Sequence, residues 1–211
     1  MELLVVVAII AMLLAILLPS LSKARAQAKL VIVNHDLYQI GLALETYEIN
    51  NNDWPLVRPD CQAGADYIYS LPPELIKGGY LPGHKKGTLL FNDIEDKYYK
   101  GHAYRYLAVG PTINLYGKAT SFKMSLKIPA LFPSDANSPL KEYIERKESP
   151  VKWILFSLGP DYDIESLQRG FPFDKGFPMV KDFWYNPKTR KGLLMRVKMS
   201  SGRYHGTFEK K

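Results

Sequence analysis

ELLVVVAIIAMLLAILLP, residues 2–19, is the stretch that decides the fold of this chain. Residues 3–18 are sixteen consecutive apolar residues, preceded by a glutamate and followed by a proline. A second, amphipathic helical stretch then runs to about Ile49. At ~1.5 Å per residue, one helix over both stretches would be roughly 70 Å long, which no small globular domain can bury. We therefore expect the first half to lie in lipid or against other copies, and the second half to carry the domain.

Three interpretations of the apolar run compete. A buried core helix is disfavoured because no polar residue marks a solvent face. A cleaved signal peptide normally has a basic n-region and a small-residue cleavage site, and this run has neither. The run spans about 24 Å, a little less than the roughly 30 Å hydrocarbon core of a bilayer. A membrane helix that begins slightly upstream of Met1 therefore fits best.

The second half of the helix carries one apolar stripe. Its members follow a 3-4-3-4-3 spacing, which is typical of one helix face: Leu30, Val33, Leu37, Ile40, Leu44 and Tyr47. Gly41 beside the stripe indicates close backbone packing, because glycine costs about 1 kcal/mol relative to alanine inside a helix. Residues 50–53 and Pro55 should end the helix. Pro19 should kink or interrupt it, with Ser20 or Ser22 capping a restarted helix.

The remainder reads as short strands and loops. Alternating or continuous apolar patterns predict strands over residues 104–109, 120–128, 151–158, 193–199 and 203–208. Of these, residues 120–128 and 193–199 should each have one exposed face. Residues 71–82 predict a short helical turn, residues 78–87 a surface loop, and Ser138-Pro139 a short helix to about Lys147.

These patterns predict an α+β fold, in which one long N-terminal helix packs on a small antiparallel sheet. We divide the chain into a membrane or assembly half (1–19), an amphipathic spine (20–53) and a sheet domain (54–211).

Composition and motifs argue against several kinds of function. The net charge of +7 is spread through 211 residues with no basic helix or stacking motif, so we expect no nucleic-acid partner. Cys61 is the only cysteine, which excludes an internal disulfide. The four histidines have no zinc spacing, and no nucleophile or phosphate-binding motif is present. We expect no catalytic residues.

One acidic loop follows the strand at 151–158. It places Asp161 and Asp163 at alternate positions after a Gly-Pro turn. Alternating carboxylates in a bent loop suit Ca²⁺, and a solvated turn is the alternative.

The N-terminal quarter of the chain also resembles a known family. Residues 2–11, the Leu-Leu-Pro-Ser-Leu-Ser-Lys-Ala-Arg segment at 17–25, residues 37–44 and the Asn-Asn-Asn-Asp-Trp-Pro exit at 50–55 are similar to type IV pilins and type II secretion pseudopilins. Glu2 matches the glutamate that this family keeps near its mature N-terminus, and Pro19 matches its helix-kinking proline. Met1 stands where the family has a basic leader, a glycine cleavage site and an aromatic first residue.

The resemblance implies a pilin-like fold and a non-enzymatic function. The chain would be a subunit of a type II secretion pseudopilus or a type IV pilus-like filament, assembling with copies of itself or other pseudopilins. Glu2 would pair with the terminal amine of a neighbouring subunit. We expect the native start to lie upstream and a prepilin peptidase to cut there; with Met1 as the true start, we expect no cleavage and a weaker anchor. Major pseudopilins bind calcium near the loop that matches Asp161 and Asp163.

Orientation divides the two lines of reasoning. Lys23, Arg25 and Lys29 follow the apolar run, so the positive-inside rule favours a cytoplasmic domain. The resemblance implies the opposite, a single-pass protein of the bacterial inner membrane with its domain on the periplasmic side, and we adopt that expectation.

The rival function is an envelope enzyme or carbohydrate-binding domain that uses the helix only as a tether.

Overall fold

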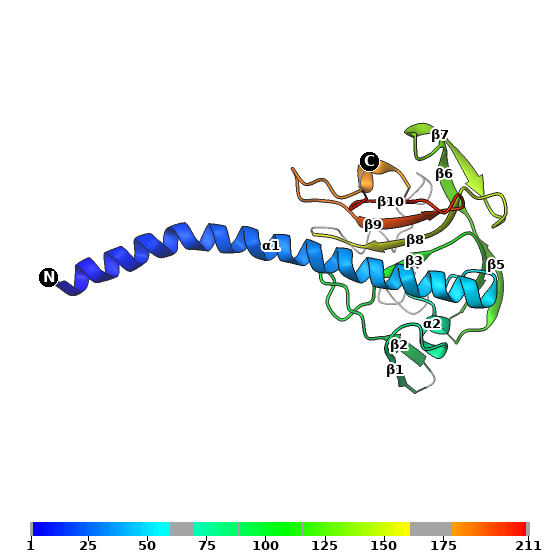
Figure 1. The fold of residues 1–211 in the computed structure, drawn as a ribbon, viewed down its shortest axis with the longest axis horizontal. Coiled ribbons are helices and arrows are strands. Elements are labelled where there is room, and N and C mark those ends of the chain that lie inside the picture. The colour runs from blue at the N-terminus through cyan, green and yellow to red at the C-terminus, as the bar shows by residue number, and fades with distance from the viewer. Residues whose placement is uncertain (1, 60–69, 88, 115, 161–178, 210–211) are drawn as a thin grey trace.

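The computed structural model describes residues 2–59, 70–87, 89–114, 116–160 and 179–209. One helix, α1 (Glu2–Asn51), extends far beyond a sheet domain that packs on its second half (Figure 1). The predicted α+β arrangement, with one long N-terminal helix and antiparallel sheets, is confirmed.

α1 passes through Pro19 without interruption. Pro19 has no N–H to donate to the carbonyl of Ala15, and the blue first half of the helix curves in Figure 1. The Ser20 hydroxyl donates back to the carbonyl of Leu17 at 2.8 Å. The expected bend is therefore present, but the expectation that Ser20 or Ser22 caps a restarted helix is wrong.

Four antiparallel strands form the sheet that carries α1. Their order is β10 (Tyr204–Gly206), β9 (Leu194–Met199), β8 (Val151–Ser157) and β3 (Arg105–Leu107). β8 and β9 contact α1, and the two strands predicted last in the chain, β9 and β10, pair with each other. The short helix α2 (Pro73–Lys77) lies in the predicted helical turn.

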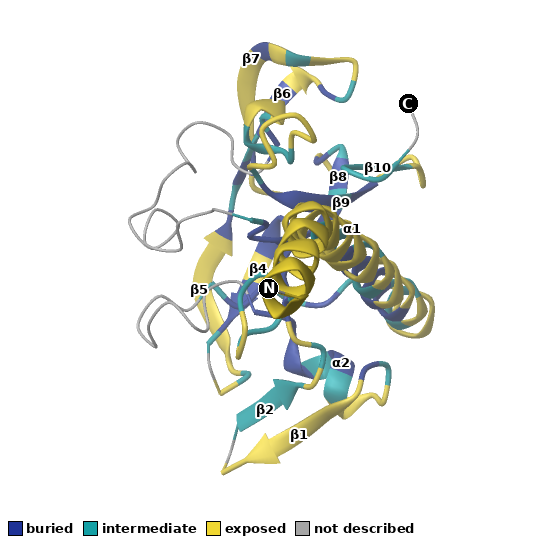
Figure 2. Cartoon of the chain, turned by 90° about the vertical axis from the view of Figure 1, so that its left-hand side faces the viewer, coloured by how far each residue is buried: buried dark blue, intermediate teal, exposed yellow. Residues whose placement is uncertain are grey.

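Three two-stranded sheets surround this unit. β1 (Gly83–Lys86) pairs with β2 (Leu89–Asn92), β4 (Gly110–Ile113) with β5 (Ala119–Met124), and β6 (Leu126–Leu131) with β7 (Asp135–Tyr143). Figure 2 shows β6–β7 and β1–β2 on opposite sides of α1. A 3-10 turn, η3 (Lys181–Phe183), precedes β9. The expected surface loop at 78–87 thus contains an exposed strand, β1.

The predicted stripe of α1 forms the centre of the core. Val33, Leu37, Ile40 and Leu44 are each at most 1% exposed, whereas Leu30 and Tyr47 are partly buried at its ends. A Cβ atom added at Gly41 would lie 3.3 Å from Arg196 Nε and close to the Trp153 ring. The stripe and the close packing at Gly41 are therefore confirmed.

Three sequence predictions are wrong in detail. Residues 138–147 do not form a helix, because β7 pairs with β6 and the Ser138 hydroxyl accepts the N–H of Leu131 within that hairpin. Residues 120–128 form two strands in different sheets, and Phe122 is 57% exposed. β9 is buried on both faces, because α1 covers the face that was expected to meet solvent.

Candidate functional site

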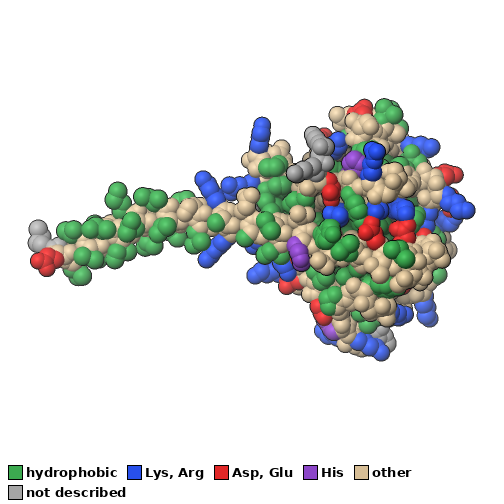
Figure 3. All heavy atoms as spheres, in the orientation of Figure 1, with side chains coloured by type: hydrophobic (Ala, Val, Ile, Leu, Met, Phe, Trp, Pro, Cys, Tyr) green, Lys and Arg blue, Asp and Glu red, His purple; other side chains and the backbone are tan. Residues whose placement is uncertain are grey.

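The first half of α1 is an apolar rod that no described part of the domain covers. Residues 2–21 are all exposed, and Leu3 is 77% exposed. Figure 3 shows this rod as green side chains projecting from the domain, and Figure 2 shows it end-on. Removing one large aliphatic side chain from water stabilises a protein by about 1.5–3 kcal/mol. An apolar surface of this size is therefore expected to contact lipid or another protein chain instead of water. Within the described residues, α1 alone is long and apolar enough to cross a membrane.

The two predicted assembly residues lie at opposite ends of this rod. Glu2 occupies the first turn of α1, where the helix dipole favours a negative charge. Pro19 lies seventeen residues later, about 26 Å along the axis. Within one subunit they therefore form no common site, and no ion pair joins the Glu2 carboxylate to another described residue.

A group of cations marks the end of the rod. Lys23, Arg25 and Lys29, which we call the basic collar, follow the apolar rod along α1. Figure 3 shows blue side chains where the helix meets the domain. The Lys29 Nζ atom is 5.6 Å from the centre of the Tyr98 ring, which brings the loop before β3 against the helix. In the sequence these cations indicate only an orientation in the membrane, whereas in the structure they line the same hollow as a loop far along the chain.

Charged contacts hold the second half of α1 in one position on the sheet. Lys198 pairs with Glu45, and Lys152 pairs with Glu48 one helical turn further on. Burial raises the pKa of Glu45, but hydrogen bonds from Lys198 and Tyr204 and the nearby cations outweigh it, so the net pKa is lowered. We call these two ion pairs the seam.

Further hydrogen bonds fix both ends of the packed half. The Tyr104 hydroxyl donates to Asp36 Oδ2 at 2.8 Å, and burial together with this carboxylate raises the pKa of Tyr104 far above its usual value. Beyond the last turn of α1, Arg146 Nη1 contacts Asp53 Oδ1 at 2.6 Å and donates to the carbonyl of Trp54 at 2.9 Å. The domain is thus attached along the helix from Asp36 to Trp54.

A second apolar surface on α1 was missed by the sequence analysis. Val31, Tyr38, Leu42 and Ile49 are between 40% and 76% exposed, although they lie on the half that carries the domain. Their spacing of 7-4-7 places them along one flank of the helix. The signal was present in the sequence, as apolar residues outside the core stripe. Apolar exposure therefore continues from the rod along the domain.

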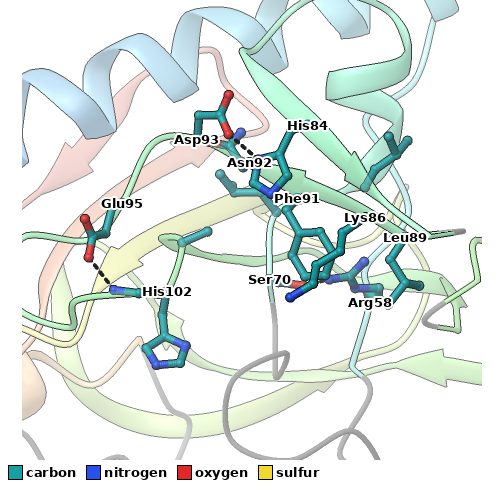
Figure 4. A pocket seen from close by; sticks show the side chains of 14 residues that line it. Arg58, Ser70, His84, Lys86, Leu89, Phe91, Asn92, Asp93, Glu95 and His102 are labelled. Carbon is teal, nitrogen blue, oxygen red and sulfur yellow. Dashed lines mark hydrogen bonds and ion pairs between the residues drawn. The ribbon is translucent and has the colours of Figure 1, made fainter.

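One hollow on the domain collects polar groups. It is a cavity of about 690 Å³ beside β1 and β2. In Figure 4, His84 stacks on Phe91 with ring centres 5.7 Å apart, and its Nδ1 lies 2.6 Å from Asp93 Oδ1. The Glu95 carboxylate instead accepts the backbone N–H of Gly101. Both carboxylates are thus engaged within the protein.

No described part of the chain brings together three or more His, Cys, Asp or Glu side chains in a metal-binding arrangement. The predicted calcium ligands Asp161 and Asp163, and also Cys61, lie outside the described residues. No protein-family model, curated protein or solved structure matches this chain. The distinctive features of the described residues therefore lie along α1: an uncovered apolar rod, a basic collar and a firmly attached domain.

Proposed function

We propose that the chain is a non-enzymatic, membrane-anchored subunit of a pilin-like filament, of the type II secretion pseudopilus or type IV pilus kind. The observation that carries the proposal is the continuity of α1. One helix supplies both the core of the domain and an apolar rod that the domain leaves bare. A tether alone would not need this rigid connection, whereas a filament subunit must hold its domain at a fixed position relative to the helix.

Before assembly, the rod would lie in the bacterial inner membrane as a single span, with the domain on the periplasmic side. Its sixteen apolar residues are ~24 Å long, slightly short of the hydrocarbon core, so the bilayer would thin or the flanking cations would reach back to the interface. In the filament, copies of the same rod would replace lipid as its cover. Apolar exposure continuing through Tyr38, Leu42 and Ile49 supports a partner that also contacts the outer flank of the helix beside the domain.

In this proposal, Glu2 selects the axial register between neighbouring subunits. An ionised carboxylate inside the apolar layer costs about 2.5–3.5 kcal/mol on insertion scales unless it has a partner. A neighbouring subunit's terminal amine would offset that cost only in the correct axial register. Pro19 would permit the rod to bend as it leaves the bilayer for the filament.

The experiment is a Glu2→Ala substitution in the full chain, expressed together with its own secretion or pilus machinery. We expect a folded, membrane-bound subunit that is absent from the sheared-filament fraction. Glu148→Ala, which removes an exposed carboxylate far from α1 in sequence, is the matched control and should assemble normally. Normal assembly of the Glu2→Ala subunit would exclude the pairing role.

One observation favours the rival function, an envelope enzyme or carbohydrate-binding domain on a tether. The hollow in Figure 4 offers an imidazole, an aromatic ring and an amide together at His84, Phe91 and Asn92, which suits a sugar ligand. A glycan-binding screen with the full chain and with His84→Ala separates the two functions. Selective glycan binding that His84→Ala abolishes would support the rival, and its absence favours the filament subunit.

A further inference from the structure

A groove lies where the basic collar meets the domain. Its volume is about 1060 Å³, and α1 residues between Ser22 and Asn34 form one wall. Side chains from three separate loops form the other wall, among them Tyr98, Arg190 and Phe208. In Figure 1 the orange segment before β9 projects from the domain toward the free half of α1. We call this hollow the collar groove.

The collar groove is strongly cationic. Lys23, Arg25 and Lys29 enter it from the helix and Arg190 from the facing loop, while none of its described lining residues is acidic. Lys23, Arg25 and Arg190 also make no ion pair with any other described residue. Four cations from distant parts of the chain therefore share one hollow in which no described lining residue supplies a negative charge, which favours an anionic ligand.

The N-terminal end of the groove lies close to the level of the lipid headgroups. If Leu18 marks the edge of the hydrocarbon, Lys23 lies about 7.5 Å and Arg25 about 10.5 Å beyond it along α1. The headgroup layer of a bilayer is about 5–7.5 Å thick on each side. Helical side chains lean toward the N-terminus, so these cations point back toward that layer. Leu30 and Phe208 supply apolar walls beside them.

We propose that the collar groove binds the phosphate of an anionic phospholipid headgroup and so docks the domain on the membrane surface. Arg and Lys would contact the phosphate oxygens, and the apolar walls would cover the glycerol backbone. A zwitterionic lipid would bind less tightly, because its own cationic group opposes the four positive charges. The inference rests on membrane insertion of α1, which is part of the proposed function, and is independent of filament assembly.

Native mass spectrometry of the full chain in a non-ionic detergent tests the site. Phosphatidylglycerol should bind at least tenfold more tightly than phosphatidylcholine. Arg190→Gln and Arg25→Gln should each weaken phosphatidylglycerol binding about fivefold, the factor that corresponds to about 1 kcal/mol for one cation near an anionic surface. Lys147→Gln is the matched control, because Lys147 is exposed and next to Arg146, beyond the far end of α1, and it should change nothing.

Three results would overturn the inference. These are equal binding of the two lipids, an equal effect of the control and groove variants, or displacement of phosphatidylglycerol by an equal concentration of inorganic phosphate, which would make the site one for a soluble anion. Flotation with neutral phosphatidylcholine vesicles tests membrane insertion separately. A chain that does not float contradicts the membrane anchor, whereas a chain that floats without preferring phosphatidylglycerol contradicts only the groove.

Discussion

Two leucines on the same helix, about 1.4 turns apart, should respond very differently to truncation. Leu37 is 1% exposed within the core stripe of α1, whereas Leu42 is 40% exposed on the uncovered flank. Both residues are helical and distant from either end of α1, so Leu→Ala makes the same local change at each. The comparison therefore isolates the contribution of packing between helix and domain.

The expected magnitudes follow from this burial. Leu→Ala at a fully buried site costs about 2.7–5.0 kcal/mol, because the lost transfer energy is joined by the cost of the cavity left behind. Leu42 is 40% exposed, so its truncation opens no enclosed cavity, and only about half of the roughly 1.5–3 kcal/mol gained by fully burying such a side chain is lost there. We expect Leu37→Ala to lower the free energy of unfolding by about 3 kcal/mol and Leu42→Ala by about 1 kcal/mol.

Urea unfolding of the full chain in mild detergent measures both values. Tryptophan fluorescence is a suitable probe, because the Trp153 ring is fully buried beside Gly41 at the contact between α1 and β8. Leu13→Ala in the rod is the second control, and it should leave the unfolding midpoint unchanged. Equal losses for Leu37→Ala and Leu42→Ala would refute the idea that only one face of α1 carries the domain.

Three further predictions concern the domain itself. Glu45→Gln should lower the free energy of unfolding at pH 7 by about 1–2 kcal/mol, because Lys198 loses its partner. The pKa of Glu45 is lower in the folded protein than its ordinary value of 4.5, so the stability from this pair is fully present above pH 4.5 and is lost as the pH falls through the folded-state pKa. Urea titrations between pH 3 and 7 would measure this loss. Burial and nearby cations lower the pKa of His205 below 6.5, so stability should fall as pH drops below about 6.5, and thermal melts of His205→Gln should show a flatter pH dependence. Gly159→Ala should cost at least about 2 kcal/mol in the same melts, because Gly159 has φ +71° and its added Cβ would lie 2.0 Å from the carbonyl oxygen of Gly192.

Sequence periodicity was sufficient for the helix and its core face. The stripe from Leu30 to Tyr47 follows from the 3.6-residue repeat alone, so no tertiary information is needed to find it. The Ser138-Pro139 pair misled for the opposite reason. It is a local signal for a helix start, but the ladder from Leu126–Tyr143 through Pro129–Leu140 is a non-local interaction that overrides it.

The prediction that one face of β9 meets solvent was wrong, because the polar residues on that face contact α1. Arg196 and Lys198 alternate with buried residues, which predicts a solvent face. In the structure that face lies under α1, where Arg196 is 5.1 Å from the Tyr38 ring centre and Lys198 pairs with Glu45. A buried face of this kind cannot be recognised until the helix above it supplies the partners.

The collar groove was beyond sequence analysis for a simpler reason. Lys29 and Arg190 are more than 150 residues apart, and neither lies in a recognisable binding motif. Only the fold places the loop that carries Arg190 against the helix. The cations of the helix were visible in the sequence, but the groove that they line was not.

The two ion pairs of the seam explain why the domain packs at a single axial position along α1. An apolar stripe with 3-4 spacing repeats every seven residues, so packing alone tolerates a slip of about 10.5 Å along α1. In a slipped arrangement, Lys198 would face Tyr38 or Asn52 in place of Glu45, and a largely buried cation would lose its partner. Partly buried ion pairs contribute little net stability over apolar contacts, but they discriminate strongly between registers. The register in turn sets how far the domain lies from Lys29 and the rest of the basic collar, and therefore whether the collar groove forms at the level of the lipid headgroups.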